Sequence, residues 1–457
     1  MVARDIGTPH QRATAILRTH GVTPFRKILT PEMFCAGLPG TPPAWTVLIP
    51  EVVFWLMVTV ALSGDGSMAG AVAAFWASLR TLWPHLPAKP ITEEAFCLAR
   101  KALPRRFFLR LFAAVVSGFD QQFPQSHRWR GLRLLGIDGM DFDLPHSARL
   151  REIYPPPSNQ HGARRRPQAR LVGLVGLCDG LCRSFRLVPL ACGEQRCARS
   201  LLRNLRPGDM LLADCNFGNY GMMAQACCQG AEFLYRLQSN RFHKVARIAT
   251  PSGRPDEWYA VLTIPAAVRK QLPQAPATLT VRILQYQILG FRPSRLVTSL
   301  LDVERYPYEE IVPLYHERWR QETQHREWKY TLQVSNLRSR KPEGILKEVL
   351  VQLTLNNVIR WMMAEAGGTE RRPVDLKFLE AKRLILAAIP AMAAARTEQL
   401  PFLYRALLKD IAREVILVRP GRSYPRRFDG QPRNKGHGKA AQPAKLPATK
   451  EPNHATI

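Results

Sequence analysis

The stretch that decides the fold lies at residues 132–138 and reads Leu-Arg-Leu-Leu-Gly-Ile-Asp, an apolar run of strand length that ends in a carboxylate. A second run of this kind, Met-Leu-Leu-Ala-Asp, occupies residues 210–214. Burying an unpaired carboxylate is costly, so an acidic side chain at the end of an apolar strand needs a partner or a task. Open α/β sheets hold their ligands at the carboxyl ends of strands, which places Asp138 and Asp214 in one candidate site. Taken singly, each is also compatible with an ordinary turn or cap aspartate.

Around these two runs the chain has the texture of an α/β unit. Five segments of strand length and two of helical character follow one another in the order β-β-β-α-β-α-β, which predicts a mixed sheet with helices and is the order of a ribonuclease-H-like domain. The predicted strands cover 132–137, 171–177, 184–190, 210–213 and 232–237, and the helices cover 197–205 and 220–229.

The rest of the chain is divided by changes in composition. Helical runs at 51–62, 68–82 and 93–116 predict a helical domain at the N-terminus. We expect its basic residues between Arg100 and Arg110 to make it a DNA-binding domain, and a merely solvated face is the alternative. Strand-like segments after residue 237 predict a β-rich insertion, and helices resume at Pro307. The predicted boundaries are 1–128 for the N-terminal domain, 129–237 for the first part of the core, 238–306 for the insertion, 307–370 for the second part of the core, 371–418 for C-terminal helices and 419–457 for a basic disordered tail.

The net charge of the chain indicates what kind of molecule it binds. Lys and Arg number 65 against 36 Asp and Glu, a formal net charge of +29, while 46% of the residues are hydrophobic. That hydrophobic content excludes a wholly disordered basic protein, so a folded body meets a polyanion, which we expect to be DNA. The longest apolar stretch, residues 52–62, falls short of the roughly twenty residues of a membrane span. With no secretory signal at the start, we expect a cytoplasmic protein without a membrane partner or an organic cofactor.

A third carboxylate belongs to the helix predicted from 307 to about 332. Tyr315, Arg318, Glu322 and Lys329 fall on one face about 60° wide at roughly 100° per residue. Considered alone, this row is also an ordinary salt-bridged stripe. Three carboxylates brought together favour Mg²⁺, with Mn²⁺ as a substitute, because hard cations prefer oxygen ligands. Four of the nine cysteines have spacings that could be forced into a zinc site, but we expect free thiols in a reducing compartment; they are Cys178, Cys182, Cys192 and Cys197.

The string Tyr315-x2-Arg318-x3-Glu322-x6-Lys329 resembles the Y-R-E-K signature of bacterial insertion-sequence transposases of the DDE class. The segments 135–139 and 211–217 are similar to the first and second aspartate motifs of that family, although Met140 stands where Thr is usual and Cys215 where Arg is common. The resemblance implies that Asp138, Asp214 and Glu322 are the catalytic and metal-binding residues. It also implies a ribonuclease-H-like core, and a synaptic complex of two protein molecules with two transposon ends.

The function implied is a transposase that binds the terminal inverted repeats of its element, cleaves the ends and transfers the 3′-hydroxyl strands to target DNA by two-metal chemistry. A structure-directed nuclease on the same core, or a non-catalytic DNA-binding derivative, stays open. Asp141 and Asp143 alternate on a predicted strand, could reach the same cavity and are rivals of Asp138 for the role of the first aspartate. An aromatic of the insertion could stack a flipped base; the candidates are Trp258, Tyr259 and Phe291. The expected contacts to the DNA backbone are Tyr315, Arg318, Lys329, Arg164, Arg165, Arg166, Arg338, Arg340 and Lys341.

Overall fold

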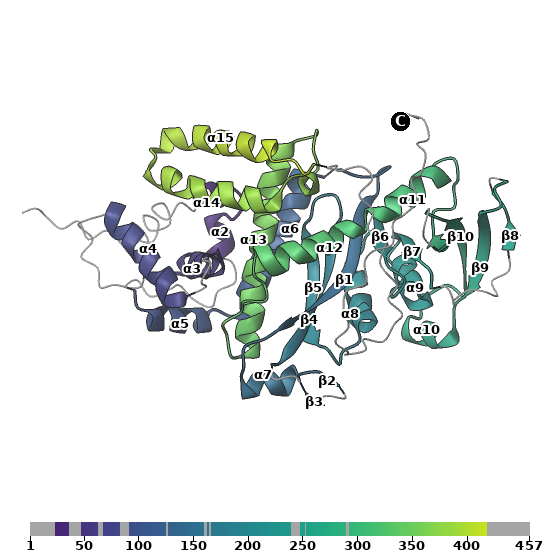
Figure 1. Ribbon diagram of the computed structural model, residues 1–457, viewed down its shortest axis with the longest axis horizontal. Coiled ribbons are helices and arrows are strands. Elements are labelled where there is room, and N and C mark those ends of the chain that lie inside the picture. The colour runs from purple at the N-terminus through teal and green to yellow at the C-terminus, as the bar shows by residue number, and fades with distance from the viewer. Residues whose placement is uncertain are drawn as a thin grey trace, which may run out of the picture.

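A computed structural model describes residues 23–35, 47–62, 67–82, 91–124, 127–159, 162–163, 166–238, 247–251, 253–288 and 292–417 (Figure 1). The predicted basic tail lies outside these ranges. The helices are α2 (Pro31–Cys35), α3 (Pro50–Leu62), α4 (Met68–Leu82), α5 (Glu93–Ala102), α6 (Arg105–Gln122), α7 (Ala148–Ile153), α8 (Glu194–Leu201), α9 (Tyr220–Cys228), α10 (Ala266–Gln271), α11 (Tyr308–His316), α12 (Trp319–Arg326), α13 (Pro342–Gly367), α14 (Phe378–Ala394) and α15 (Leu400–Arg413). The strands are β1 (Arg133–Asp143), β2 (Ser158–Asn159), β3 (Gly162–Ala163), β4 (Gln168–Gly176), β5 (Cys182–Pro189), β6 (Asp209–Ala213), β7 (Glu232–Arg236), β8 (Arg247–Ala249), β9 (Glu257–Thr263), β10 (Thr278–Tyr286) and β11 (Ser294–Thr298).

One mixed sheet of nine strands forms the centre of the molecule, which confirms the predicted α/β class. Its order is β5-β4-β1-β6-β7-β11-β10-β9-β8. Strands β1, β4 and β5 form an antiparallel meander, and β6 and β7 run parallel to β1. The chain therefore passes through β1, β4, β5, α8, β6, α9 and β7, with α7 and the short β2–β3 pair placed between β1 and β4.

The strands of the predicted insertion extend this sheet. β11 pairs with β7 in antiparallel register, and β10 and β9 follow it. Helix α9 covers the junction on one face, where Met222 and Met223 pack in one cluster with Val281 of β10 and Val297 of β11. Strands β8–β11 are thus continuous with the core sheet, because the backbone hydrogen bonds of β7 are completed by β11.

Helices cover both faces of the sheet. Helices α8 and α9 pack on one face with the odd-numbered residues Leu135 and Ile137 of β1. Helix α11 packs on the other face, where Leu134 meets Leu314 and Tyr315. Alternation of side chains along β1 puts Gly136 and Asp138 on this second face, which α12 crosses in Figure 1.

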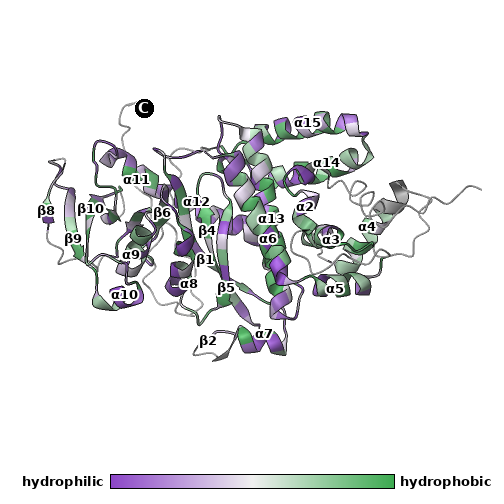
Figure 2. Ribbon diagram, turned by 180° about the vertical axis from the view of Figure 1, so that it is seen from behind, coloured by the Kyte–Doolittle hydropathy of each residue, from purple (hydrophilic) through white to green (hydrophobic). Residues whose placement is uncertain are grey.

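The N-terminal and C-terminal helices share a single core. Phe54 of α3, Phe107 of α6, Leu353 of α13 and Ile411 of α15 belong to one buried cluster, and α13 packs against α6, α14 and α15 (Figures 1 and 2). Helix α13 is buried nearly all round instead of being amphipathic, and its buried Asn357 bonds the backbone N and O of Cys182 at the start of β5, each at 2.9 Å. The helical layer is therefore fixed to the edge of the sheet by polar as well as apolar contacts.

One predicted helix is divided in the structure. The run expected over 93–116 is broken between α5 and α6, where Leu103 is extended (φ −64°, ψ 123°) and Pro104 follows as the N-cap of α6. A proline ring disfavours the helical conformation in the residue before it and has no N–H to donate, so the break follows from the sequence. Among the helices of the described segments, none combines the length and the apolar character that crossing a membrane requires.

Candidate active site

Asp138 and Asp214 lie on neighbouring parallel strands. The parallel pairing of β1 with β6 runs from Arg133↔Asp209 to Gly136↔Leu212, and β6 ends at Ala213. The sequence predicted that Asp138 ends its strand, and this is wrong. Strand β1 continues to Asp143 in register with β4. Asp138 lies just beyond the point where β6 stops, so the two carboxylates still meet at one edge. Each is anchored by a short backbone contact: Gly139 N donates to Asp138 Oδ1 and Asn216 N donates to Asp214 Oδ1, both at 2.8 Å.

Helix α12 lies close against β1 and carries the third carboxylate. A Cβ atom on Gly136 would come within 2.3 Å of Gln321 Oε1, so the Gln321 side chain keeps its present position only because residue 136 is a glycine. Buried Gln321 donates from Nε2 to the carbonyl of Gly173 on β4 at 3.1 Å, which fixes the helix on the sheet. Its neighbour Glu322 accepts a hydrogen bond from Arg318 Nη2 at 3.2 Å. The structure thus brings Glu322 to the face of the sheet that carries Asp138.

The pKa of Asp138 is raised by burial and by neighbouring carboxylates. Burial raises the pKa of Asp138 to about 7, against the hydrogen bond from Gly139, and the negative charges of Glu194 and Asp214 raise it further. His325, one turn after Glu322, lies with Nδ1 3.9 Å from Asp138 Oδ2. Burial lowers the pKa of His325 to about 4, so the imidazole is neutral at neutral pH and does not compensate the carboxylate charge.

The donor set suits a hard divalent cation. Asp138 and Asp214 offer oxygen ligands at one edge, and a cation there would relieve the repulsion that contributes to the raised pKa of Asp138. As the side chains stand, the described ranges contain no group of three His, Cys, Asp or Glu side chains placed to hold a metal ion. The third carboxylate is paired with Arg318 instead. Asp138 and Asp214 therefore fit Mg²⁺ in chemistry, whereas Glu322 is held in an ion pair with Arg318.

The rival aspartates project from the opposite face of β1, because Asp141 and Asp143 alternate with Asp138 along a regular ladder. Asp141 accepts two hydrogen bonds from Arg170, at 2.7 and 2.8 Å, and Asp143 accepts one from Gln168 Nε2 at 2.6 Å. Both carboxylates are thus occupied by partners on β4.

These same residues line an open groove of about 780 Å³. Its wall includes Lys329, Arg166 and Arg170, so two of the predicted DNA contacts lie in it together with a third cation. Lys329 belongs to a π-helical turn, Glu327–Thr331, that follows α12, and the predicted long helix is also interrupted at residues 317–318. Arg164 and Arg165 fall outside the described residues.

Tyr315 differs from its prediction as a DNA contact. Its side chain is only 3% exposed and packs with Leu212 and Leu314. Burial raises the pKa of Tyr315 to about 12, and its hydroxyl has no hydrogen-bond partner among the described residues. The ring of Tyr315 thus belongs to the core between α11 and the sheet, while the charges of Arg318, Arg236 and Asp214 act on its hydroxyl. Arg318, also predicted to contact DNA, is buried against Glu322.

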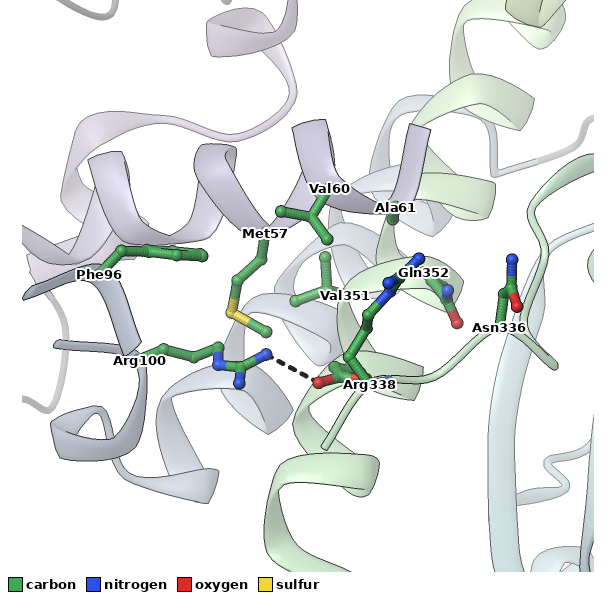
Figure 3. Close-up of a pocket in the computed structure, with 10 residues that line it drawn as sticks. Met57, Val60, Ala61, Phe96, Arg100, Asn336, Arg338, Val351 and Gln352 are labelled. Carbon is green, nitrogen blue, oxygen red and sulfur yellow. Dashed lines mark hydrogen bonds and ion pairs between the residues drawn. The ribbon is translucent and has the colours of Figure 1, made fainter. Parts of the chain in front are cut away.

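Three further predicted DNA contacts lie in the connector before α13. Arg340 and Lys341 are exposed. Arg338 is half-buried and lines a cavity of about 30 Å³ between α3, α5 and α13, beside Gln352 in Figure 3. Its backbone N–H donates to Glu348 at 2.7 Å, and Glu348 also binds Arg100 at 2.8 Å. Arg338 therefore helps to join the connector to the N-terminal helices.

The aromatic candidates of the insertion occupy different positions. Trp258 is buried in β9 with the guanidinium of Arg247 4.1 Å from the centre of its ring. Tyr259 donates its hydroxyl hydrogen to the carbonyl of Leu301. Phe291 lies outside the described residues.

All nine cysteines are described and none forms a disulfide. The four with zinc-like spacing do not assemble: Cys192 and Cys197 have their sulfur atoms 3.1 Å apart, while Cys178 and Cys182 are buried separately. This agrees with the expectation of free thiols.

Sequence reasoning missed Glu194 and His325. Glu194 begins α8, and its charge acts on Asp138, yet it lies in a polar segment that matches no pattern. His325 stands three positions after Glu322, and helical spacing alone could have placed it on the same face.

The chain is similar to known proteins over long segments. The family model described as "Transposase DDE domain" matches residues 129–357. The transposase InsG of insertion sequence element IS4 from Escherichia coli (strain K12) is 24% identical over 408 residues, which cover 87% of this chain and 90% of that protein. A cryo-EM structure of the piggyBac transposase synaptic complex with hairpin DNA superposes with a TM-score of 0.43 at 12% identity, covering 92% of this chain and 88% of that one. Because the family model spans half of the sequence, this chain belongs to the family of transposases with a DDE domain.

Proposed function

We propose that this protein is a Mg²⁺-dependent DNA transposase that binds the terminal inverted repeats of its insertion sequence, cleaves the element ends and transfers the 3′-hydroxyl strands to target DNA. One observation carries the proposal: Asp138 and Asp214 meet at the edge of the parallel strands β1 and β6, and the helix bearing Glu322 packs on β1 and on its other neighbour β4. The chain is similar over most of its length to an insertion-sequence transposase, which supports the same reaction.

We further propose that the core is ribonuclease-H-like. The order β1, β4, β5, α8, β6, α9, β7, with β1 central and β4 antiparallel to it, supports this assignment. On this scheme β8–β11 are an insertion that has joined the edge of the catalytic sheet.

Each carboxylate has a distinct situation in the proposed reaction. Asp138 and Asp214 hold their positions through backbone N–H groups and would bind cations with their free oxygens. Glu322 joins them when Arg318 turns toward the DNA phosphate. This exchange is possible because a guanidinium binds phosphate oxygens as readily as it binds the oxygens of a carboxylate. Two Mg²⁺ ions, when bound, would activate the attacking water or 3′-hydroxyl and stabilise the leaving oxygen of the phosphodiester.

The basic side chains would hold the DNA. Lys329 and Arg166 face an open groove, and the net charge of +29 favours a polyanion over the whole surface. We propose that two copies of the chain act together on two element ends in the cytoplasm. The mass of the complex formed with end DNA would measure that stoichiometry.

The test is cleavage and joining of end DNA by D138N, D214N and E322Q in Mg²⁺. Each variant should lose nicking and retain DNA binding within about twofold, because a single carboxylate is replaced by an isosteric amide. E317Q is the matched control, since Glu317 lies one turn before Gln321 but binds Arg320 and Arg372 instead. Retained nicking in any of the three variants would remove that residue from the site.

Two other outcomes separate the alternatives. A wild-type protein that nicks but cannot join pre-cut ends would be a nuclease on the same core. A protein that binds end DNA without metal-dependent nicking would be a non-catalytic derivative.

Cation binding has its own readout without DNA. Mg²⁺ or Mn²⁺ should raise the melting temperature of the wild-type protein and not that of D138N, because a ligand that binds only the folded state stabilises it. No difference between the two proteins would count against a metal site at Asp138.

A further inference from the structure

Glu194 connects the two aspartates of the site from the side of the sheet opposite α12. It is the first residue of α8, and this helix packs against β1, β4 and β5. Glu194 Oε2 accepts a hydrogen bond from Asn216 Nδ2 at 2.8 Å. Asn216 in turn donates its backbone N–H to Asp214 Oδ1 at 2.8 Å. The carboxylate of Glu194 is thus two hydrogen bonds away from that of Asp214.

The other oxygen of Glu194 lies against the residue that follows Asp138. A Cβ atom added to Gly139 would come within 2.2 Å of Glu194 Oε1, closer than any real contact. Gly139 also donates its N–H to Asp138 Oδ1, so this residue touches both carboxyl groups. The absence of a side chain at position 139 is therefore what allows Glu194 to reach the edge where β6 ends.

The loop after β6 is held by the next residue of α8 as well. Gln195 Nε2 donates to the carbonyl oxygen of Asn216 at 2.6 Å and to its side-chain Oδ1 at 3.2 Å. Asn219, the N-cap of α9, donates from Nδ2 to Gln195 Oε1 at 3.4 Å. Both ends of the Asn216 side chain are thus tied to the first turn of α8, which leaves it one orientation.

Burial raises the pKa of Glu194, and the charge of Arg170 opposes this effect. Arg170 forms its ion pair with Asp141, and no ion pair of Glu194 is found among the described residues. A half-buried carboxylate that no described cation neutralises directly is costly, and its position needs a function that offsets the cost.

We propose that Glu194 is a positioning residue for strand cleavage, which holds Asp214 through Asn216 and packs against Gly139 beside Asp138, so that both aspartates keep one common orientation. This inference rests on the proposed function of the site. Helix α8 would then align Asp138 and Asp214 from one face of the sheet, while α12 packs on the other face.

The first experiment compares E194A with E194Q on end DNA. Glutamine keeps an oxygen that accepts from Asn216 Nδ2, so E194Q should nick within about threefold of wild type, whereas E194A should be slower by about tenfold or more, because misalignment of reacting groups costs orders of magnitude in rate. E194A should also need several-fold more Mn²⁺ for half-maximal nicking, with DNA affinity unchanged. A purely structural loss would lower the melting temperature without shifting the Mn²⁺ requirement.

A double-mutant cycle makes the inference sharper. G139A displaces the Glu194 carboxylate by its new Cβ atom and should slow nicking in the wild-type background. In an E194A background the same substitution should cost almost nothing, since the atom that it meets is gone. N216A should likewise slow nicking alone and add little to E194A.

The control is E152Q, which neutralises an exposed glutamate paired with Arg149 on α7. If wild type and E152Q nick normally, three results would each overturn the role of Glu194 while leaving the proposed function intact: E194A nicking at the wild-type rate, E194Q as slow as E194A, or additive losses for G139A and E194A. If wild type itself does not nick, the proposed function fails instead.

Discussion

Arg318 and Glu322 face each other across one turn, with Arg318 Nη2 3.2 Å from Glu322 Oε1, at the junction where α12 begins. Arg318 is buried and also lies with its guanidinium 5.3 Å from the centre of the Trp319 ring. A cation of the protein thus occupies the carboxylate that we assign to metal binding. On the proposed function, this ion pair opens before Glu322 binds a cation.

Because Arg318 is paired with Glu322, we expect R318A to strengthen cation binding and to slow strand cleavage. Without the competing guanidinium, the DNA-free protein should bind Mn²⁺ several-fold more tightly, because a neighbouring positive charge is removed. Nicking should fall because the phosphate contact is lost. Titration of the melting temperature with Mn²⁺ measures the first effect; R320A, on the same helix but bound to Glu317, is the control. Equal or weaker Mn²⁺ binding in R318A would refute this competition.

Asp138 predicts a pH-dependent gain in stability for D138N. The pKa of this carboxyl is raised to about 7 in the folded protein, above the usual value of roughly 4 in an unfolded chain. The folded state therefore holds a proton that the unfolded state releases, and stability falls as the pH rises from about 4 to about 7. In metal-free buffer, D138N should melt several degrees above wild type at pH 8 and close to it at pH 4. The same difference at both pH values would show that charge is not the cause.

Lys329 predicts a change in the salt dependence of DNA binding. K329A should bind end DNA more weakly, and the slope of log K against log salt should become shallower by about one ion, because one phosphate contact is lost. K270A on α10, where Lys270 is exposed, should leave the slope unchanged. Filter-binding or anisotropy titrations at several salt concentrations provide the measurement, and an unaltered slope for K329A would exclude a phosphate contact.

Arg282 and Glu257 predict a large loss of stability when one is removed alone. Both side chains are fully buried in β10 and β9, and Arg282 Nη1 also donates to the carbonyl of Tyr306 at 2.6 Å. R282M should destabilise the protein by about 3–5 kcal/mol, since it removes the guanidinium that balances the buried charge of Glu257. The double variant R282M/E257M should recover part of this loss in urea unfolding. A single variant within about 1 kcal/mol of wild type would show that this buried ion pair contributes little to stability.

Part of the site could be predicted because its signals are local. The two apolar runs that lead to Asp138 and Asp214 became adjacent parallel strands, and the spacing of Arg318 and Glu322 put them in contact on one helix. Pro104 divides a helix that periodicity alone extends. Tyr315 lies on the same predicted helix face as Arg318 and Glu322, yet its side chain is buried. Helical spacing predicts the side of the helix from which a side chain projects, but not the part of the protein that packs against that side.

The sequence by itself determined the α/β class, the strand–carboxylate pattern and the family signature, since each depends on residues within one turn or one strand. Only the tertiary structure decided that β11 joins the insertion to β7, that the terminal helices share one core around α13, and that Glu194 meets Gly139 and Asn216. These contacts join residues far apart in the chain, and sheet register and helix packing, which act between segments, select them.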